Sequence, residues 1–316
     1  MSDKPFSKAA VVGTGMMGPG IAMTLALGGV PAVILSRTAE GAKKGLDAAR
    51  AQLRLLSGAG LADPERAAEA SARLSASTAF DETVAGVDLA IESAPENMQF
   101  KQQLFARMDG IAKPGAVLAS NTSGLSITAI ASRCARPERV LTTHFWNPPH
   151  LMPLVEIVKG EKTSDETAET MRRFLTACGK VAVMVKKDRP GQLGNRLQMA
   201  LVREAVHIVA EGIASVEDVD IAAKTGFGLR LPVYGILEHQ DMVGLDMAFA
   251  INDYVSGDLY NEPRAPALYR EMVERGDLGV KTGKGFYDWS TKDPAAVRAR
   301  RDQFVLDFLR ASRETP

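Results

Sequence analysis

Residues 9–18 read AAVVGTGMMG, and this stretch decides the fold. Four small or branched apolar residues, typical of a buried β-strand, lead directly into a G-x-G-x-x-G motif that opens an apolar helical segment. In such a strand-turn-helix unit the first glycine permits a tight turn, the second lets backbone N–H groups approach a pyrophosphate, and the third allows helix and strand to pack closely. The stretch therefore predicts a dinucleotide-binding site. Its expected members are Gly13, Gly15, Met16, Met17 and Gly18.

Short β-type runs alternate with longer helical segments through the first half of the chain. After the first strand, the clearest runs are residues 32–35, 89–92, 117–120 and 181–185. This alternation predicts βαβ units that build an α/β domain with a doubly wound parallel sheet of the Rossmann type. Residues 41–76 are rich in alanine, arginine and leucine, with two glycines in the middle, and they predict a helical hairpin inserted between two strands.

A polar turn at residues 186–191, KKDRPG, marks the expected domain boundary. Beyond it the apolar residues follow a helical period, and residues 215–218, SVED, have the S-x-x-D pattern of a capping box that starts a helix. We therefore expect a dinucleotide-binding domain over residues 1–187 and an all-helical C-terminal domain over residues 188–316.

The charge balance argues against several classes of partner. The 316 residues include 38 Lys plus Arg and 38 Asp plus Glu, so a formal net charge of zero gives no bulk attraction to nucleic acid or to an anionic membrane. The N-terminus lacks a secretory signal pattern, no window reaches the roughly 18 apolar residues that span a bilayer, and Cys134 and Cys178 form no metal-binding cluster. We expect a cytoplasmic protein with no bound metal, no nucleic-acid partner and no membrane contact.

The residues after the second strand bear on the choice of cofactor. An acidic residue at this position normally binds the adenosine ribose of NAD. Here the chain reads Ser36-Arg37-Thr38, which offers hydroxyl donors and one fixed positive charge to a 2′-phosphate. We therefore favour NADP as the cofactor. The alternative is that Arg37 is a solvated loop residue and that the cofactor is NAD.

Polar clusters follow the later strands, where the ligands of open parallel sheets bind. His144 is suited to accepting a proton near neutral pH, and aromatic residues and a prolyl turn, FWNPP at residues 145–149, follow it. A carboxylate on the other ring nitrogen would select the tautomer and stabilise the imidazolium, and Glu156 is the candidate. These residues predict proton transfer with a substrate oxygen. The alternative is a structural histidine in an aromatic patch.

Over nearly its full length the sequence resembles the L-3-hydroxyacyl-CoA dehydrogenases and their relatives, which include 3-hydroxybutyryl-CoA dehydrogenase, lambda-crystallin and carnitine dehydrogenase. The most specific matching pieces are GTGMMGPGIA, PENMQFKQQLF, ASNTSGLSIT, HFWNPPHLMPLVEIV, KKDRPGQLGNRL and KTGKGFYDW. The resemblance implies an oxidoreductase that interconverts a 3-hydroxyacyl-CoA and its 3-keto form by hydride transfer with NAD(P). It also implies a homodimer formed through the C-terminal domain.

The same resemblance implies roles for individual residues. His144 is the general base or acid, and Glu156 is its partner. Ser123 and Asn195 hydrogen-bond the reacting oxygen. The residues expected near the nicotinamide ribose and ring are Glu96, Lys101, Ser123 and Asn147, and Asn121 is a further expected cofactor-binding residue.

Two features of the sequence leave the substrate open between a CoA ester and a small carrier-free hydroxy acid or alcohol. The hairpin, which resembles the CoA-contacting element of the family, is poor in lysine, and Arg50 and Arg54 are its candidate phosphate clamp. The pieces ENMQFKQQLF and NPPHLMPLVEIV are closer to relatives that act on carrier-free substrates, for which His150 and Arg230 are candidate contacts.

Two functions of another class stay open. One is a structural protein of the crystallin kind, and the other is an NADP-binding module without catalysis. The joint presence of all four expected catalytic residues favours the enzyme, because a non-catalytic descendant is free to lose any of them.

Overall fold

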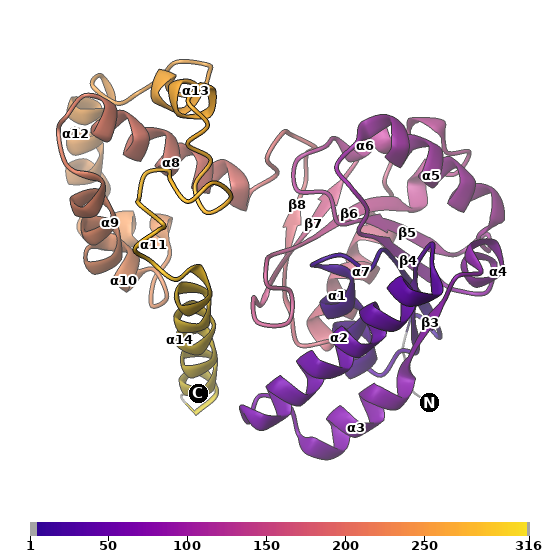
Figure 1. Cartoon of the computed structure of the whole chain (residues 1–316). Helices are drawn as coiled ribbons and strands as arrows, with labels where there is room; N and C mark the ends of the chain where they lie inside the picture. The colour runs from indigo at the N-terminus through magenta and orange to yellow at the C-terminus, as the bar shows by residue number, and fades with distance from the viewer. Residues whose placement is uncertain (1–4, 315–316) are drawn as a thin grey trace. The chain divides into compact units, whose positions relative to one another are not determined.

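An eight-stranded sheet forms the centre of the N-terminal part of the chain in the computed structural model, which describes residues 5–314 (Figure 1). The strands are β1 (Ala9–Val12), β2 (Ala32–Leu35), β3 (Leu74–Ser77), β4 (Leu89–Glu92), β5 (Val117–Ser120), β6 (Val140–Phe145), β7 (Leu154–Lys159) and β8 (Val181–Val185). They lie in the order β3-β2-β1-β4-β5-β6-β7-β8, and β6 and β7 are the antiparallel pair. The C-terminal ends of β1, β2, β4, β5 and β6 therefore meet the N-terminal end of β7 at one edge.

Helices cover both faces of this sheet. Alternate residues of a strand point to opposite faces, so β1 sends Ala9 and Val11 into one apolar core and Ala10 into the other. The helices of the first core are α1 (Gly18–Leu27), α2 (Ala39–Gly58), α3 (Pro64–Arg73), α7 (Asp165–Ala177) and the end of α14 (Pro294–Glu314), which contributes Leu306. Those of the second are α4 (Phe80–Ala85), α5 (Met98–Ile111) and α6 (Ile127–Ile130). The predicted doubly wound α/β fold is confirmed.

The C-terminal part of the chain is helical. Its helices are α8 (Gly194–Ala210), α9 (Val216–Thr225), α10 (Phe227–Arg230), α11 (Ile236–Val243), α12 (Leu245–Ser256), α13 (Ala267–Glu274) and α14 (Pro294–Glu314). The chain divides into two compact units. One contains the residues up to Asn195 together with those from Arg300 onward, and the other is Arg196–Ala299. The predicted capping box is confirmed, because Ser215 accepts a hydrogen bond from the Asp218 amide at the start of α9.

Three strands are absent from the sequence-based prediction, whereas the five predicted strands have the expected bounds. The unexpected ones are β3, β6 and β7. Buried polar side chains interrupt the apolar runs in β6 and β7, among them Thr142, His144 and Glu156. Their strand character depends on their neighbours in the sheet, which local sequence does not reveal. Within residues 5–314, no helix is both long and apolar enough to cross a membrane.

Candidate active site

The glycine-rich turn between β1 and α1 has the geometry of a dinucleotide-binding loop. Gly13 has a φ of 123°, which L side chains rarely adopt, and a Cβ at Gly18 would overlap the carbonyl oxygen of Gly13. Apart from Gly15 itself and its two chain neighbours, no described residue has an atom within 4 Å of the Cβ position of Gly15. Met16 is exposed, and Met17 at the helix N-terminus makes no side-chain cap. The open space beside Gly15, at the start of α1, is the expected position of the pyrophosphate of NAD or NADP.

The turn after β2 holds the residues from which we predict the cofactor type. Thr38 Oγ1 accepts a hydrogen bond from Gly41 N at 3.1 Å and so caps α2, while Ser36 Oγ accepts one from Thr38 N at 3.4 Å. Arg37 is exposed, and Glu40 lies in the first turn of the same helix. A phosphate bound here would gain the charge of Arg37 but would also lie near an acidic side chain.

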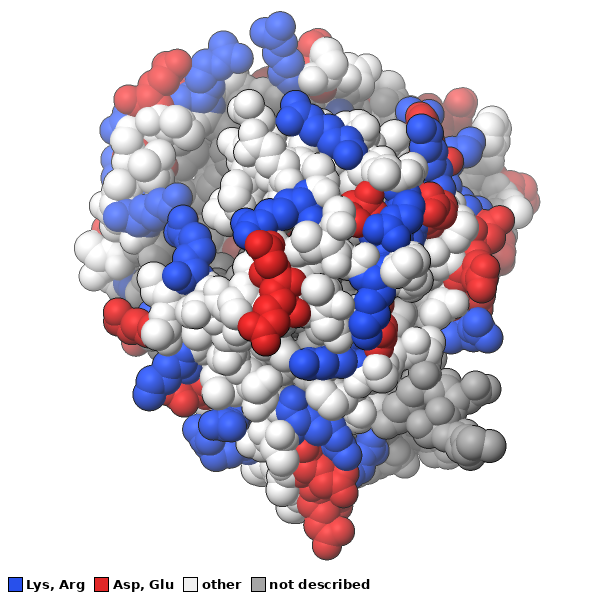
Figure 2. Space-filling model, turned by 90° about the vertical axis from the view of Figure 1, so that its right-hand side faces the viewer, with Lys and Arg blue, Asp and Glu red and all other residues white. Residues whose placement is uncertain are grey.

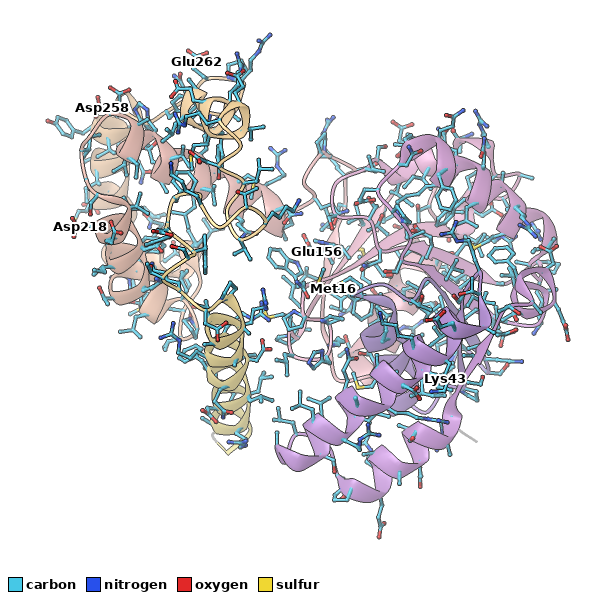
Figure 3. The ribbon with its side chains drawn as sticks, in the orientation of Figure 1. Met16, Lys43, Glu156, Asp218, Asp258 and Glu262 are labelled. Atoms are coloured by element: carbon cyan, nitrogen blue, oxygen red, sulfur yellow. The ribbon has the colours of Figure 1, made fainter. Side chains whose placement is uncertain are left out.

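His144 lies near the end of β6, directly opposite Glu156 on β7. The His144 Nδ1 and Glu156 Oε2 atoms are 2.6 Å apart, and the two residues are 5% and 0% exposed. Glu156 is labelled in Figure 3. The antiparallel pairing of the two strands aligns residues that are 12 apart in the chain. Because the carboxylate engages Nδ1, the other ring nitrogen, Nε2, is the one suited to exchange a proton with a ligand.

The Glu156 carboxylate accepts hydrogen bonds at both oxygens. Besides His144, Oε2 accepts the Trp146 indole N–H at 3.0 Å. Oε1 accepts the backbone N–H groups of Leu193 and Gly194 at 2.9 and 2.8 Å. Burial raises the pKa of Glu156, but the hydrogen bonds that it accepts, the one from His144 first, lower it by more. The pKa therefore lies below its ordinary value, and the carboxylate is ionised at neutral pH.

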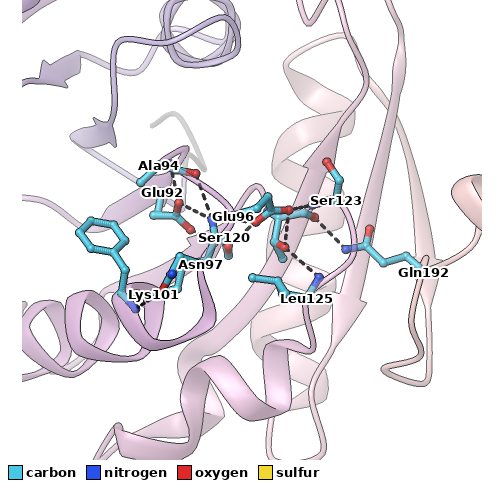
Figure 4. Close-up of polar contacts among 11 residues, drawn as sticks. Glu92, Ala94, Glu96, Asn97, Lys101, Ser120, Ser123, Leu125 and Gln192 are labelled. Carbon is cyan, nitrogen blue, oxygen red and sulfur yellow. Dashed lines mark hydrogen bonds and ion pairs between the residues drawn. The ribbon is translucent and has the colours of Figure 1, made fainter. Parts of the chain in front are cut away.

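A second buried carboxylate organises the ends of β4 and β5 (Figure 4). Glu92 and Lys101, which are 0% and 1% exposed, form an ion pair with an Oε1–Nζ distance of 2.6 Å, and Ser120 Oγ donates to Glu92 Oε2 at 2.6 Å. Lys101 Nζ also lies 3.3 Å from Glu96 Oε2. Glu96 Oε1 in turn accepts the Ser123 backbone N–H at 2.6 Å. A chain of polar contacts thus runs from Glu92 to Ser123.

Asparagine side chains connect the segments that surround the site. Asn121 Oδ1 accepts the Phe145 backbone N–H at 2.8 Å and so joins the end of β5 to the end of β6. Asn195 Nδ2 donates to the Ser123 carbonyl oxygen at 2.8 Å. Asn147 is exposed on the loop that follows β6. The structure therefore brings the Asn195 side chain into contact with the backbone of Ser123.

Comparison with known proteins identifies the family. The family model for the NAD binding domain of 3-hydroxyacyl-CoA dehydrogenase matches residues 8–189, and the model for its C-terminal domain matches residues 191–289. The chain belongs to the 3-hydroxyacyl-CoA dehydrogenase family. It is an NAD(P)-dependent oxidoreductase. The predicted family is confirmed.

Relatives of this 3-hydroxyacyl-CoA dehydrogenase family member carry different names. The 5-formyl-3-hydroxy-2-methylpyridine 4-carboxylate 5-dehydrogenase of Mesorhizobium japonicum is 34% identical over 304 residues, which cover 95% of this chain and 96% of the relative. The 3-hydroxybutyryl-CoA dehydrogenase of Bradyrhizobium diazoefficiens is 36% identical, with coverage of 92% and 98%. A solved structure of a 5-formyl-3-hydroxy-2-methylpyridine 4-carboxylic acid 5-dehydrogenase, described as an NAD+-dependent dismutase, has a TM-score of 0.89 and 31% identity, with coverage of 96% and 98%.

The candidate substrate residues of this family member lie on three parts of the chain, namely α2, the loop between β6 and β7, and α10. Arg50 is half-buried and Arg54 is exposed, and both lie on α2. His150 is half-buried in the loop between β6 and β7, and this burial is the main reason that its pKa is lowered. Arg230 is exposed on α10 in the second unit. Figure 2 shows Lys and Arg interspersed with Asp and Glu over the displayed face, as expected for a chain of zero net charge.

Three residues that organise the site have no role in the sequence-based prediction. Glu92 has a weak signal, since it is an acidic residue at the end of an apolar strand. Trp146 has none, because an aromatic residue beside a histidine is ordinarily part of a core. Gln192 is buried with a positive φ of 55°, and its Nε2 donates to the Thr122 carbonyl oxygen at 2.8 Å across a separation of 70 residues. This contact depends on the fold.

Proposed function

We propose that this family member oxidises a secondary hydroxyl, or reduces the matching ketone, with His144 as the group that accepts and returns the proton. One observation carries the proposal. The buried His144–Glu156 pair lies at the C-terminal edge of the sheet, the same edge that carries the glycine-rich turn. An imidazole held at Nδ1 by a carboxylate is a general base whose tautomer is fixed.

The neighbouring residues support this chemistry. In the oxidation direction His144 Nε2 takes the hydroxyl proton while ionised Glu156 stabilises the imidazolium. NAD(P), when bound, accepts or supplies the hydride. Ser123 and Asn195 donate hydrogen bonds to the substrate oxygen, whose charge changes between alcohol and ketone. The Asn195 amide carries two N–H donors, so the bond to the Ser123 carbonyl leaves one of them for a ligand.

The variant His144→Gln tests the role of His144. We expect turnover to fall by roughly 10²- to 10⁴-fold, the contribution of general acid-base catalysis, while the Kd of the cofactor stays close to that of the wild type. His207→Gln is a matched control, because His207 lies in the second unit beside Tyr260. Unchanged turnover in His144→Gln would contradict the proposal.

The proposed substrate is a 3-hydroxyacyl-CoA, in line with the 3-hydroxybutyryl-CoA dehydrogenases among the relatives. A small carrier-free hydroxy compound is the second candidate. The similarity to a pyridine carboxylate dehydrogenase favours it, and so does α2, where Lys43 is paired with Asp47 at 2.8 Å instead of being free for a phosphate. Initial rates with acetoacetyl-CoA and with free 3-keto acids separate the two candidates.

The proposed cofactor is NADP. Arg37 is exposed beside the expected position of the adenosine ribose, and no carboxylate occupies residues 36–38. Glu40 opposes this preference, so the rates with NADPH and NADH are measured side by side. Arg37→Ala should lower kcat/KM for NADPH and leave that for NADH unchanged. Faster turnover of wild type with NADH than with NADPH would show that NAD is the cofactor.

We also propose that the chain forms a homodimer through its second unit. Large apolar side chains on α11 and α12 are exposed, including Leu237 at 80% and Tyr254 at 89%, and the same unit has an apolar cavity of about 580 Å³. Exposed apolar surface of this extent is typical of an interface, and a two-fold dimer covers it on both copies. Sedimentation velocity should give the mass of two chains. A monomer at micromolar concentration would contradict the proposal.

A further inference from the structure

We propose that Trp146 is a positioning residue of this reaction, and that its indole N–H holds the Glu156 carboxylate in the orientation that fixes the His144 ring. The inference rests on the proposed role of His144 as the proton acceptor. It assigns to Trp146 a task that packing alone does not require.

The contacts of Glu156 Oε2 are the first support. This oxygen is shared by two ring N–H groups, His144 Nδ1 at 2.6 Å and Trp146 Nε1 at 3.0 Å. The centroids of the two rings are 5.7 Å apart, and their planes are inclined by 51°. Because Oε1 is bound by two backbone amides, the carboxylate has donors on both sides and cannot rotate without losing several hydrogen bonds. Trp146 supplies the second side-chain donor to this carboxylate, beside His144.

Gly194 is the second, independent support. A Cβ at this position would overlap the six-membered ring of Trp146, so the indole lies against the bare backbone of Gly194. The N–H of the same glycine donates to Glu156 Oε1. One residue therefore makes room for the Trp146 ring and binds the carboxylate to which that ring donates. This geometry fixes the direction in which the indole N–H points.

Loss of the indole N–H has two consequences. The carboxylate becomes freer to rotate, which lowers turnover. Its negative charge also acts more fully on the imidazolium, so the protonated enzyme persists to higher pH. The ionisable side chain in contact with His144 is Glu156 from β7. Two other charged side chains contact residues close to His144 or to Asn121 in the chain. Lys180 Nζ, just before β8, lies 5.9 Å from the centroid of the Phe145 ring, and Glu96 Oε1 accepts the backbone N–H of Ser123.

Trp146→Phe tests the inference, because phenylalanine retains an aromatic ring and removes the donor. We expect kcat to fall by roughly tenfold, the lower end of what supporting groups cost in other sites, with little change in KM. The acidic limb of the kcat/KM profile should move to higher pH by roughly half a unit. Trp289→Phe is the matched control, since Trp289 is the other tryptophan of the chain and lies in the second unit.

Gly194→Ala gives a second test that leaves the indole chemically intact. The added Cβ displaces the ring, so this variant should reproduce the loss in kcat and the shift of the acidic limb, and the double variant should show less than the product of the two effects. A Trp146→Phe enzyme with an unmoved acidic limb and unchanged kcat, or with a change in KM alone, would overturn the inference. If His144→Gln keeps its turnover, the proposed function fails instead, whatever Trp146→Phe shows.

Discussion

Two buried glutamates at one edge of the sheet, Glu156 and Glu92, pair with different kinds of side chain. Glu156 pairs with His144, an imidazole of the kind that gains and loses a proton near neutral pH. Glu92 pairs with Lys101, an ammonium of the kind that ordinarily keeps its proton there. Both carboxylates are fully buried and accept several hydrogen bonds. The difference agrees with the proposed role of the first pair in proton transfer, and it suits the second pair to holding its neighbours in position.

The largest expected effect comes from replacing each of the two glutamates with the isosteric glutamine and comparing the turnover of the two variants. Glu156→Gln places an NH₂ group against N–H donors, because all four partners of this carboxylate donate. We expect turnover to fall by roughly 10²- to 10⁴-fold, as when the acid of a catalytic triad becomes an amide. Glu92→Gln should lower turnover far less. Steady-state rates at saturating substrate give both values, and equal losses in the two variants would end the distinction.

The second prediction concerns the stability of the Glu92–Lys101 pair. Lys101→Met leaves the Glu92 carboxylate buried without its ammonium partner, so the free energy of unfolding should fall by about 3–5 kcal/mol. Urea unfolding measures the change. The double variant Glu92→Gln with Lys101→Met should recover part of it, because no buried charge then lacks a partner. A loss below about 1 kcal/mol, typical of a surface ion pair, would show that the pair is not structural.

The smallest expected effect comes from a partly exposed ion pair outside the site. Burial raises the pKa of Asp88, but hydrogen bonds from Lys113 and Ser7 lower it by more, to about 2. A carboxyl whose pKa is lower in the folded state stabilises the fold above its unfolded pKa and loses this contribution as the pH falls toward 2. Asp88→Asn should therefore cost about 1–2 kcal/mol at pH 7 and progressively less between pH 4 and pH 2.

Unfolding of Asp88→Asn and wild type at pH 7, 5 and 3 measures this dependence. Asp81→Asn is the control, because Asp81 forms a solvent-exposed pair with Arg107, so this variant should change stability little at any of these pH values. If the difference in the free energy of unfolding between Asp88→Asn and wild type stays constant down to pH 3, the ionised carboxyl of Asp88 is not the stabilising group.

Sequence predicts the parts of this fold that are locally encoded. The glycine motif and the five apolar strands carry their signal in consecutive residues, so their bounds agree with the structure. β6 and β7 do not, since buried polar residues such as Thr142, His144 and Glu156 interrupt their apolar pattern. The edge strand β3, LSAS, is too polar and too short to stand out.

The residues of the candidate site also divide into those that the sequence identifies and those that only the structure reveals. His144 and Glu156 are named as partners from sequence, and the structure places their atoms 2.6 Å apart, while their catalytic roles stay predictions. Trp146, Gln192 and Glu92 gain their importance from contacts with segments distant in the chain. Gln192, for example, binds a carbonyl 70 residues away. No local pattern records such a contact, so the network around His144 and Glu156 requires the structure.

The antiparallel return of β7 along β6 has a consequence for how such enzymes diverge. The register that sets His144 opposite Glu156 belongs to the two strand backbones, and the connecting residues after Trp146 do not define it. Loops at the end of a rigid scaffold tolerate insertion and exchange. Changes in residues 147–153, by natural divergence or by loop grafting, can therefore alter the substrate preference while the register of His144 and Glu156 stays in place.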